Sequence, residues 1–437
     1  MFTTLKNAFK IKEIRMKLLF TFLMLVVIRF GSQLPVPGVD REYFSSWFEA
    51  QTGGAFNFFD AFTGGSFLNM SIFALNITPY ITSSIIMQLL TIAIPKLEEM
   101  QKDGEDGRKK IASITRYVTV ALALIESAAM AIGFGNQGLL ENYNALNVIT
   151  VIAALTAGSA FLMWIGERIT EKGVGNGISI VLIINIISRM PDDFSNLYEQ
   201  FIKGKSTPLA VFAAVVIIAI VLAMIVIVVL LNGGVRKIPV QYAKKIQGNK
   251  MVGGQMTFLP LKVNTAGVIP IIFASSLMQL PIVISTFVGY QGTGAWSHIL
   301  KGLNQDNWCK PDQIVYSIGL VVYIVLTVFF AYFYTSLTFN PLEIANNMKK
   351  QGGFIPGIRP GKPTSDYLTK VLNAIIFIGA VGLVIIAVVP FFFNGVFGAS
   401  VSFGGTSLII IVSVVLETIK QIESQMLVRN YKGFLND

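Results

Sequence analysis

The sequence predicts an all-α polytopic membrane protein whose ten transmembrane helices form two inverted five-helix halves. Three observations lead there: apolar runs of bilayer length, scarce charge, and basic residues gathered in alternate loops. Of the 437 residues, 53% are hydrophobic and only 13% are charged, whereas about 25% of a typical soluble domain is charged. This composition excludes an ordinary soluble enzyme and also a disordered chain, which needs low hydrophobicity and high charge.

Ten apolar runs have roughly the length that a helix needs to cross the hydrocarbon core, about 20 residues. They cover residues 18–37, 71–94, 112–133, 147–167, 176–190, 209–231, 266–289, 313–336, 371–391 and 404–422. The first run is followed by prolines rather than by a small-residue cleavage site. We therefore expect it to be a retained span and not a cleaved signal peptide.

The loops between these runs alternate in charge. Of the 34 lysines and arginines, 27 lie in the N-terminal tail, the even-numbered connections and the C-terminal tail. Because cytoplasmic loops are enriched in Lys and Arg, this alternation predicts that both termini lie in the cytoplasm. Only an even number of spans allows that, which supports a count of ten.

The ten runs divide evenly around a polar segment. Residues 1–190 form the predicted N-terminal half, residues 191–208 an external hinge connection, and residues 209–437 the C-terminal half. An odd number of spans in each half makes the two halves inverted relative to each other. Inverted halves are typical of transport proteins, with the pathway between the repeats.

Two of the basic connections are long. The connection 232–264 has alternating residues on both sides of a glycine-rich turn near 248–254, which predicts a hairpin. The connection 337–370 contains a stretch, 352–363, in which glycine and proline prevent a helix. The positive-inside bias explains their charge but not their length, so a docking surface is the favoured interpretation.

Two further features leave alternatives open. Segment 53–70 is rich in phenylalanine, is broken by Gly64 and Gly65, and is too short and polar to span. It fits an interfacial helix or a re-entrant segment buried in protein equally well. Ile77, Ile81 and Ile85 lie on one face of the second run. Such a stripe more often faces lipid or a neighbouring helix than a functional site.

Catalytic and metal-binding patterns are scarce in this chain. It has one cysteine and one histidine, and the glycine-rich stretch 173–177 lacks the Gly-Lys-Ser/Thr ending of a phosphate loop. We therefore expect no catalytic residue, no cofactor and no metal. A coupled transporter needs buried carboxylates or histidines as relays, and Glu126 is a single central candidate.

Seven stretches then match one family in order along nearly the whole chain. They are FALNITPYI (73–81), GEDGRKKI (104–111), GVGNGISI (173–180), RKIPVQYA (236–243), GVIPIIFASS (267–276), FIPGIRPG (354–361) and FGGTSL (403–408). With these motifs the sequence resembles the bacterial SecY family, the channel subunit of the general protein translocase.

The resemblance implies a clam-shell of two halves around an hourglass pore with an apolar ring at its waist. The ring positions of the family match Ile77, Ile81, Leu182, Ile186, Ile272 and Ile410. Leu182 departs from the commoner isoleucine but is equally apolar. A narrow apolar constriction dewets and blocks ions, so under this resemblance the isoleucine stripe becomes functional.

The resemblance also implies a plug that closes the external side of the pore, near residues 56–70. The matching plug residues are Phe58, Phe59, Phe62, Gly64, Gly65 and Phe67. A lateral gate would lie between the second and third spans and the seventh and eighth. Pro270 would permit a kink in the seventh span.

The two basic loops would form the cytoplasmic dock of the family, for the ribosome and for the SecA ATPase. The matching residues are Arg236, Lys237, Lys244, Lys250, Arg359 and Lys362. SecE- and SecG-type small subunits, signal peptides, nascent chains and membrane lipids are the other implied partners. The expected function is a protein-conducting channel of the bacterial cytoplasmic membrane, which catalyses no reaction. The alternative is an inverted-repeat secondary transporter of small solutes.

Overall fold

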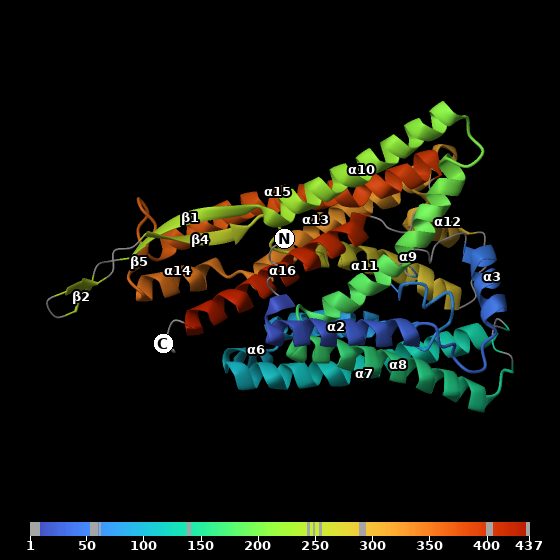
Figure 1. Cartoon of the computed structure of the whole chain (residues 1–437), viewed down its shortest axis with the longest axis horizontal. Coiled ribbons are helices and arrows are strands. Elements are labelled where there is room, and N and C mark those ends of the chain that lie inside the picture. Colours follow the sequence, from blue (N-terminus) through green and yellow to red (C-terminus); the bar gives the residue numbers. More distant parts are fainter. Residues whose placement is uncertain are drawn as a thin grey trace.

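The computed structural model is an elongated helical bundle with a small sheet at one end (Figure 1). It describes residues 9–52, 60, 63–136, 138, 140, 142–242, 245–247, 250–252, 256–287, 294–398 and 405–433. The helices are α2 (Lys12–Gly31), α3 (Arg41–Thr52), α5 (Thr78–Ala93), α6 (Pro95–Lys102), α7 (Glu105–Asn136), α8 (Ala145–Lys172), α9 (Gly177–Phe201), α10 (Thr207–Gly233), α11 (Ile269–Phe287), α12 (Ala295–Leu303), α13 (Ile318–Thr338), α14 (Pro341–Lys350), α15 (Lys362–Phe397) and α16 (Gly405–Gly433). Two 3-10 helices, η1 (Gln305–Asn307) and η2 (Pro311–Ser317), lie between α12 and α13.

Each of the ten predicted spans overlaps one of these helices. Within the described part of the chain, five helices are long and apolar enough to cross a membrane. A sixth crossing is added if α5 and α6 count as one span, although they bend by 106°. In several other helices, such as α9 and α16, only part of the length is apolar and the remainder is polar. Their apolar parts are too short to pass the same test. The structure thus has several apolar helices, and the count of ten spans remains a prediction.

The helices form two groups, each with its own hydrophobic core. Figure 1 shows α2, α7 and α8 together on one side and α10, α13 and α15 on the other. One buried cluster draws only on residues between 36 and 155, and a second only on residues between 224 and 409. The groups meet where α9 packs against α16 and α7 against α11. The region between them is therefore where a site shared by both groups can form.

Helix α9 begins with a defined cap and a close approach to α8. The Asn176 side chain accepts hydrogen bonds from the backbone N–H groups of Ile178 and Ser179, at 3.1 and 3.4 Å, which satisfies donors that the first turn leaves free. A Cβ atom on Gly177 would lie 1.8 Å from the carbonyl oxygen of Gly166 in α8. Only glycine permits this approach, which positions the start of α9 beside α8.

Two details differ from the sequence expectations. Helix α9 continues through Pro191 to Phe201, so most of the predicted connection 191–208 is helical; the Ser195 hydroxyl donates to the carbonyl of Pro191 at 3.0 Å. Pro270 was expected inside a span, but α11 begins at Ile269. Pro270 therefore lies in the first helical turn, where proline costs no hydrogen bond, and the interior proline of α11 is Pro281.

The predicted hairpin is present, and it joins the other basic loop. Strands β1 (Val235–Tyr242) and β4 (Met256–Lys262) pair antiparallel, with Val235 opposite Lys262. β2 (Lys245–Gln247) and β3 (Lys250–Val252) form a second small hairpin. β5 (Gly353–Phe354) adds to the other edge of β1 and completes a three-stranded sheet. Both predicted loops are therefore parts of one folded unit.

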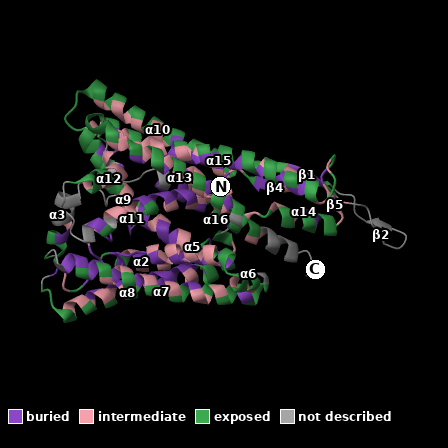
Figure 2. Cartoon of the chain, turned by 180° about the vertical axis from the view of Figure 1, so that it is seen from behind, coloured by how far each residue is buried: buried purple, intermediate pink, exposed green. Residues whose placement is uncertain are grey.

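The ends of the bundle differ in character. The sheet, α14 and α6 lie at one end, and α3 and α12 at the other (Figure 1). Figure 2 shows many exposed residues along α10, and these include large apolar side chains such as Leu209, Phe212 and Ile218. A helix that is apolar on all sides and lies on the outside of the protein typically contacts lipid.

Candidate functional site

All six residues predicted for the apolar ring lie in one hydrophobic cluster between the two helix groups. Four are buried, namely Ile77, Leu182, Ile186 and Ile410, and the two partly buried ones are Ile81 and Ile272. They come from the start of α5, from α9, from α11 and from α16. Spacing by four residues stacks Ile77 with Ile81 and Leu182 with Ile186. The structure thus brings together positions that the sequence could relate only by family resemblance.

A buried polar pair borders this cluster. The Asn185 side-chain amide donates to the side-chain oxygen of Asn76 at 3.0 Å, and both residues are buried. They directly precede the ring positions Ile186 and Ile77. Asn76 has φ of 53°, a conformation that asparagine tolerates better than most side chains. Sequence reasoning did not identify this pair, although an asparagine at the start or middle of an apolar span is a signal for it.

Most of the described part of the predicted plug is buried. Gly64 and Gly65 have positive φ angles of 67° and 82°, and Phe67 belongs to the core of the first helix group, where its ring contacts Phe44 edge to face. Phe58, Phe59 and Phe62 lie outside the described residues. Of the two alternatives for this segment, burial in protein favours the re-entrant one over an interfacial helix.

Two arginines from different helices hold this segment. The Arg189 guanidinium of α9 pairs with the Asp60 carboxylate at 2.5 Å, and Asp60 is fully buried. Arg29 of α2 donates to the carbonyl oxygen of Gly64 at 3.4 Å. Arg29 therefore turns into the protein, where the sequence would have allowed its long side chain to extend to the membrane surface. Sequence reasoning did not assign a role to Asp60 or Arg189, although each is a charged residue close to an apolar run.

The Asp60 carboxylate depends on its neighbours. Its Oδ1 atom accepts a hydrogen bond from the backbone N–H of Leu68 at 3.0 Å. Burial raises the pKa of the Asp60 carboxyl above its usual value, while Arg189 and the hydrogen bonds from Leu68 and Thr63 act against that rise. Without Arg189 a buried carboxylate would lose its main stabilising charge.

Gly64 approaches α9 too closely for any side chain. A Cβ atom there would lie 2.7 Å from the Asn185 carbonyl oxygen, whereas a Cβ on Gly65 would meet nothing closer than 3.6 Å. Both glycines have positive φ, so an alanine strains the backbone at either position, but only at Gly64 does it also clash. Gly64 is therefore the point of tightest contact between the segment and α9.

Gly64→Ala is expected to loosen the segment more than Gly65→Ala does. In a Cys309→Ser background, a cysteine introduced at buried Ser66 reports opening through its rate of thiol labelling. We expect labelling about tenfold faster with Gly64→Ala, the change that roughly 1.4 kcal/mol produces. Equal rates for the two alanine variants would show that the clash with α9 does not exist in the protein.

A cavity adjoins the ring on the side of the basic loops. It has a volume of about 450 Å³, and its lining comes from α5, α7, α8, α9 and α11. Ile81, Ile85 and Ile269 contribute an apolar wall. The polar part of the lining includes Arg116 and Glu167, which form an ion pair at 2.6 Å. A cavity with this mixed lining can receive a segment that is apolar along one side.

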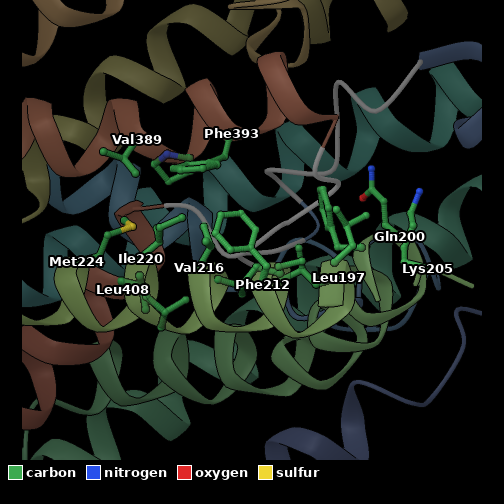
Figure 3. A pocket seen from close by; sticks show the side chains of 16 residues that line it. Leu197, Gln200, Lys205, Phe212, Val216, Ile220, Met224, Val389, Phe393 and Leu408 are labelled. Atoms are coloured by element: carbon green, nitrogen blue, oxygen red, sulfur yellow. The ribbon is translucent and has the colours of Figure 1, made fainter. Parts of the chain in front are cut away.

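A second groove lies on another side of the protein. It has a volume of about 540 Å³, and its walls come from α9, α10, α15 and α16. Figure 3 shows Gln200 and Lys205 together at one end, with apolar side chains such as Phe212 and Phe393 along the rest. Among the described residues, neither a predicted site residue nor a carboxylate lines it. Nor do the described residues contain a cluster of histidine, cysteine and acidic side chains that could hold a metal ion.

The predicted docking residues lie on and beside the sheet. Arg236 and Lys237 are exposed on β1, and Arg359 and Lys362 are exposed around the turn between β5 and α15. Lys250 begins β3, and Lys244 lies outside the described residues. The unit is rigid because side chains from β1, β4, α14 and α15 share one hydrophobic cluster. The Thr364 hydroxyl also donates to the carbonyl of Arg359 at 2.8 Å.

Comparison with known proteins agrees with these features. The family model described as SecY matches residues 71–419. The protein translocase subunit SecY of Halalkalibacterium halodurans is 44% identical over 443 residues, which cover 100% of both chains.

Two solved structures share the fold. One concerns the plug domain of the SecY protein, which stabilises the closed state of the translocation channel and maintains a membrane seal; its TM-score is 0.62 at 19% identity, and the match covers 94% of this chain and 92% of the other. The second is Sec61 in the canine ribosome-channel complex from the endoplasmic reticulum, with a TM-score of 0.57 at 17% identity, covering 94% and 93%. The full-length identity and the family match together show that this multi-pass membrane protein belongs to the SecY family.

Proposed function

We propose that this chain is the channel-forming subunit of a bacterial protein translocase. It passes unfolded secretory polypeptides across the cytoplasmic membrane and releases membrane-protein segments laterally into it. The observation that carries the proposal is the apolar cluster that contains all six ring residues and draws on both helix groups. The chain itself makes and breaks no covalent bond, and a partner ATPase or the ribosome supplies the energy.

An apolar ring suits a channel for polypeptides. A narrow apolar constriction dewets and so blocks ions while no substrate is present. Its side chains offer no fixed hydrogen-bond partner, so the ring closes around any passing sequence without binding it tightly. Ile77, Leu182 and Ile410 are buried against one another's helices, which fits a resting, closed state.

The segment around Gly64 is the plug in this proposal. Its support is the burial of the described residues and their contacts with Arg29 and Arg189. The solved SecY structure of the same fold has a plug domain that stabilises the closed channel. Gly64 and Gly65 give the segment the backbone freedom to move when the channel opens.

The architecture proposed for the membrane is ten spans in two inverted halves that open like a clam shell. Separate cores in the two helix groups support this division, and residues 191–208 connect the halves externally. The lateral gate lies between α5 and α7 on one side and α11 and α13 on the other. An apolar signal segment that prefers the open gate shifts the equilibrium towards it. Both termini lie in the cytoplasm.

The sheet with its basic residues is the proposed cytoplasmic dock. Arg236, Lys237, Lys244 and Lys250 would present positive charge to ribosomal RNA phosphate, and the planar guanidinium of Arg359 suits a carboxylate or phosphate on the SecA ATPase. The fold is shared with Sec61 in a ribosome complex. SecE- and SecG-type subunits complete the translocase, and signal peptides, nascent chains and lipids are its other partners.

The alternative, a secondary transporter of small solutes, lacks support in the site. Such a transporter needs a polar site at the membrane midplane with groups that bind the coupling ion. The cluster between the two helix groups is apolar, and the described residues that line the groove in Figure 3 include no carboxylate.

Reconstitution tests the proposal directly. The chain is purified with its co-purifying small subunits and inserted into liposomes, and SecA, ATP and an unfolded preprotein are added. We expect the preprotein to become protected from external protease, and protection to require both ATP and the signal sequence. Uptake of small solutes without any protected preprotein would instead support the transporter.

A further inference from the structure

We infer that the ion pair between Asp60 and Arg189 is a latch that sets how easily this channel opens. The inference rests on the proposed function and adds the residues that hold the plug shut. Both belong to elements that must separate when a plug leaves: Asp60 to the segment around Gly64, and Arg189 to α9. Their contact at 2.5 Å is the only ion pair in the described residues that joins this segment to a helix.

Breaking the pair is costly because it is buried on one side. Asp60 is fully buried, and Arg189 is 27% exposed. Removing one partner of such a pair leaves the other charge buried without compensation, which is far more destabilising than losing a surface pair. The closed position of the segment therefore depends on both residues together.

Hydrogen bonds connect Asp60 to other residues of its segment. Asp60 Oδ1 accepts the backbone N–H of Leu68 at 3.0 Å, and the Thr63 hydroxyl donates to the Asp60 carbonyl at 3.0 Å. Thr63 also accepts from the backbone N–H of Phe67 at 3.2 Å. The carboxylate is thus fixed within its own segment, and the contact of Arg189 with Oδ2 holds Asp60 together with Thr63, Phe67 and Leu68.

Arg189 has a second partner available when the segment leaves. Asp192, one turn further along α9, lies 3.8 Å from another nitrogen of the same guanidinium and is 68% exposed. On release Arg189 keeps this partner, and Asp60 leaves its buried position. Neither charge is then buried alone in the open state, so the latch opposes opening without making the open state inaccessible.

The position of the pair next to the ring connects it to opening. Arg189 follows Ile186 by one turn of α9, and Ser188 donates to the Gly64 carbonyl at 3.5 Å. Separation of the halves that displaces α9 therefore acts on the latch directly. With a weaker latch, a ligand needs a smaller preference for the open over the closed state to open the channel.

A double-mutant cycle on the reconstituted complex tests the latch. Asp60→Asn keeps the shape and the hydrogen-bond acceptor for Leu68 while removing the charge, and Arg189→Gln removes the other charge. Each variant is expected to raise the ion leak of resting vesicles at least about tenfold, equivalent to about 1.4 kcal/mol. The double variant is expected to leak no more than either single one, because each single variant already breaks the pair and the double variant leaves neither charge buried without its partner.

The matched control is Asp192→Asn, which makes the same change at an exposed neighbour of Arg189. Because Asp192 is the partner that Arg189 keeps in the open state, this variant is expected to leak no more than the wild type. Arg189→Lys, which keeps the charge, is expected to restore much of the seal. If the Arg189→Gln protein does not accumulate in the membrane, Asp60→Asn and Arg189→Lys are compared instead.

Three results would overturn the latch: no leak in Asp60→Asn, a leak in the double variant equal to the product of the single effects, or an equal leak in Asp192→Asn. These results leave the proposed function intact as long as the wild-type complex transports preprotein. A wild-type complex that transports no preprotein contradicts the proposed function instead, whatever the variants do.

Discussion

Replacing Ile410 by asparagine is expected to make the resting channel leak ions. Ile410 of α16 is 4% exposed and lies in the cluster with the other five ring residues. An amide at this point binds water and removes the dewetting on which an apolar barrier depends. Because a buried amide without partners is also unfavourable, the closed state itself loses stability. We expect the leak of small anions from vesicles to rise at least about tenfold, which corresponds to about 1.4 kcal/mol.

The matched control is Val414→Asn on the same helix. Val414 is buried in the same cluster one turn from Ile410 but is not a ring position, so it reproduces the loss of apolar packing. We expect a clearly smaller leak from this variant. The measurement includes transport of a preprotein with a defective signal sequence, which Ile410→Asn is expected to accept. Unchanged conductance together with unchanged signal selectivity would contradict the role of the ring.

Reversing the charge of Arg359 is expected to stop transport driven by the ATPase while the protein remains inserted. Arg359 is exposed on the turn between β5 and α15, and its carbonyl accepts the Thr364 hydroxyl. This hydrogen bond fixes the backbone that carries the Arg359 guanidinium. Removing one partner of a charge pair that becomes buried and hydrogen-bonded in an interface costs about 2–5 kcal/mol, so Arg359→Glu should lower the transport rate at least about tenfold.

Two variants define the cause of that loss. Lys301→Glu makes a similar charge reversal in α12, at the opposite end of the bundle (Figure 1), and should transport normally. Arg359→Lys keeps the charge but not the planar fork, and an intermediate rate would indicate bidentate recognition. The amount of inserted protein and the leak of resting vesicles should not change. Normal secretion by Arg359→Glu would refute the assigned docking role.

Local patterns in the sequence were sufficient for much of the fold. Helices overlap all ten predicted runs, because a bilayer-length apolar run has no alternative to helix in a membrane. The hairpin in the connection 232–264 was predicted correctly from alternation around a glycine-rich turn. Helix ends were less predictable: α9 runs past Pro191, and Pro270 begins α11, because caps and neighbouring polar residues decide where a helix stops.

The candidate site was predicted only in part. Motif resemblance selected the six predicted ring residues, which the structure brings into one cluster, but their spacing alone favoured ordinary packing. The ion pair of Asp60 with Arg189 and the pair of Asn76 with Asn185 were not predicted at all. A charge near an apolar run shows in the sequence that a partner is needed, but it does not identify the partner.

By itself, the sequence indicated membrane residence and the approximate places of the helices, and its charge pattern predicts the sidedness of the basic loops. Each of these depends on the transfer of neighbouring residues between water and lipid, which is a local property. Only the tertiary structure decided that the two basic loops form one sheet, that the ring residues meet, and that Arg189 reaches Asp60. These contacts join residues far apart in the chain, so they exist only once the two helix groups have packed and brought α9, α11 and α16 around one centre.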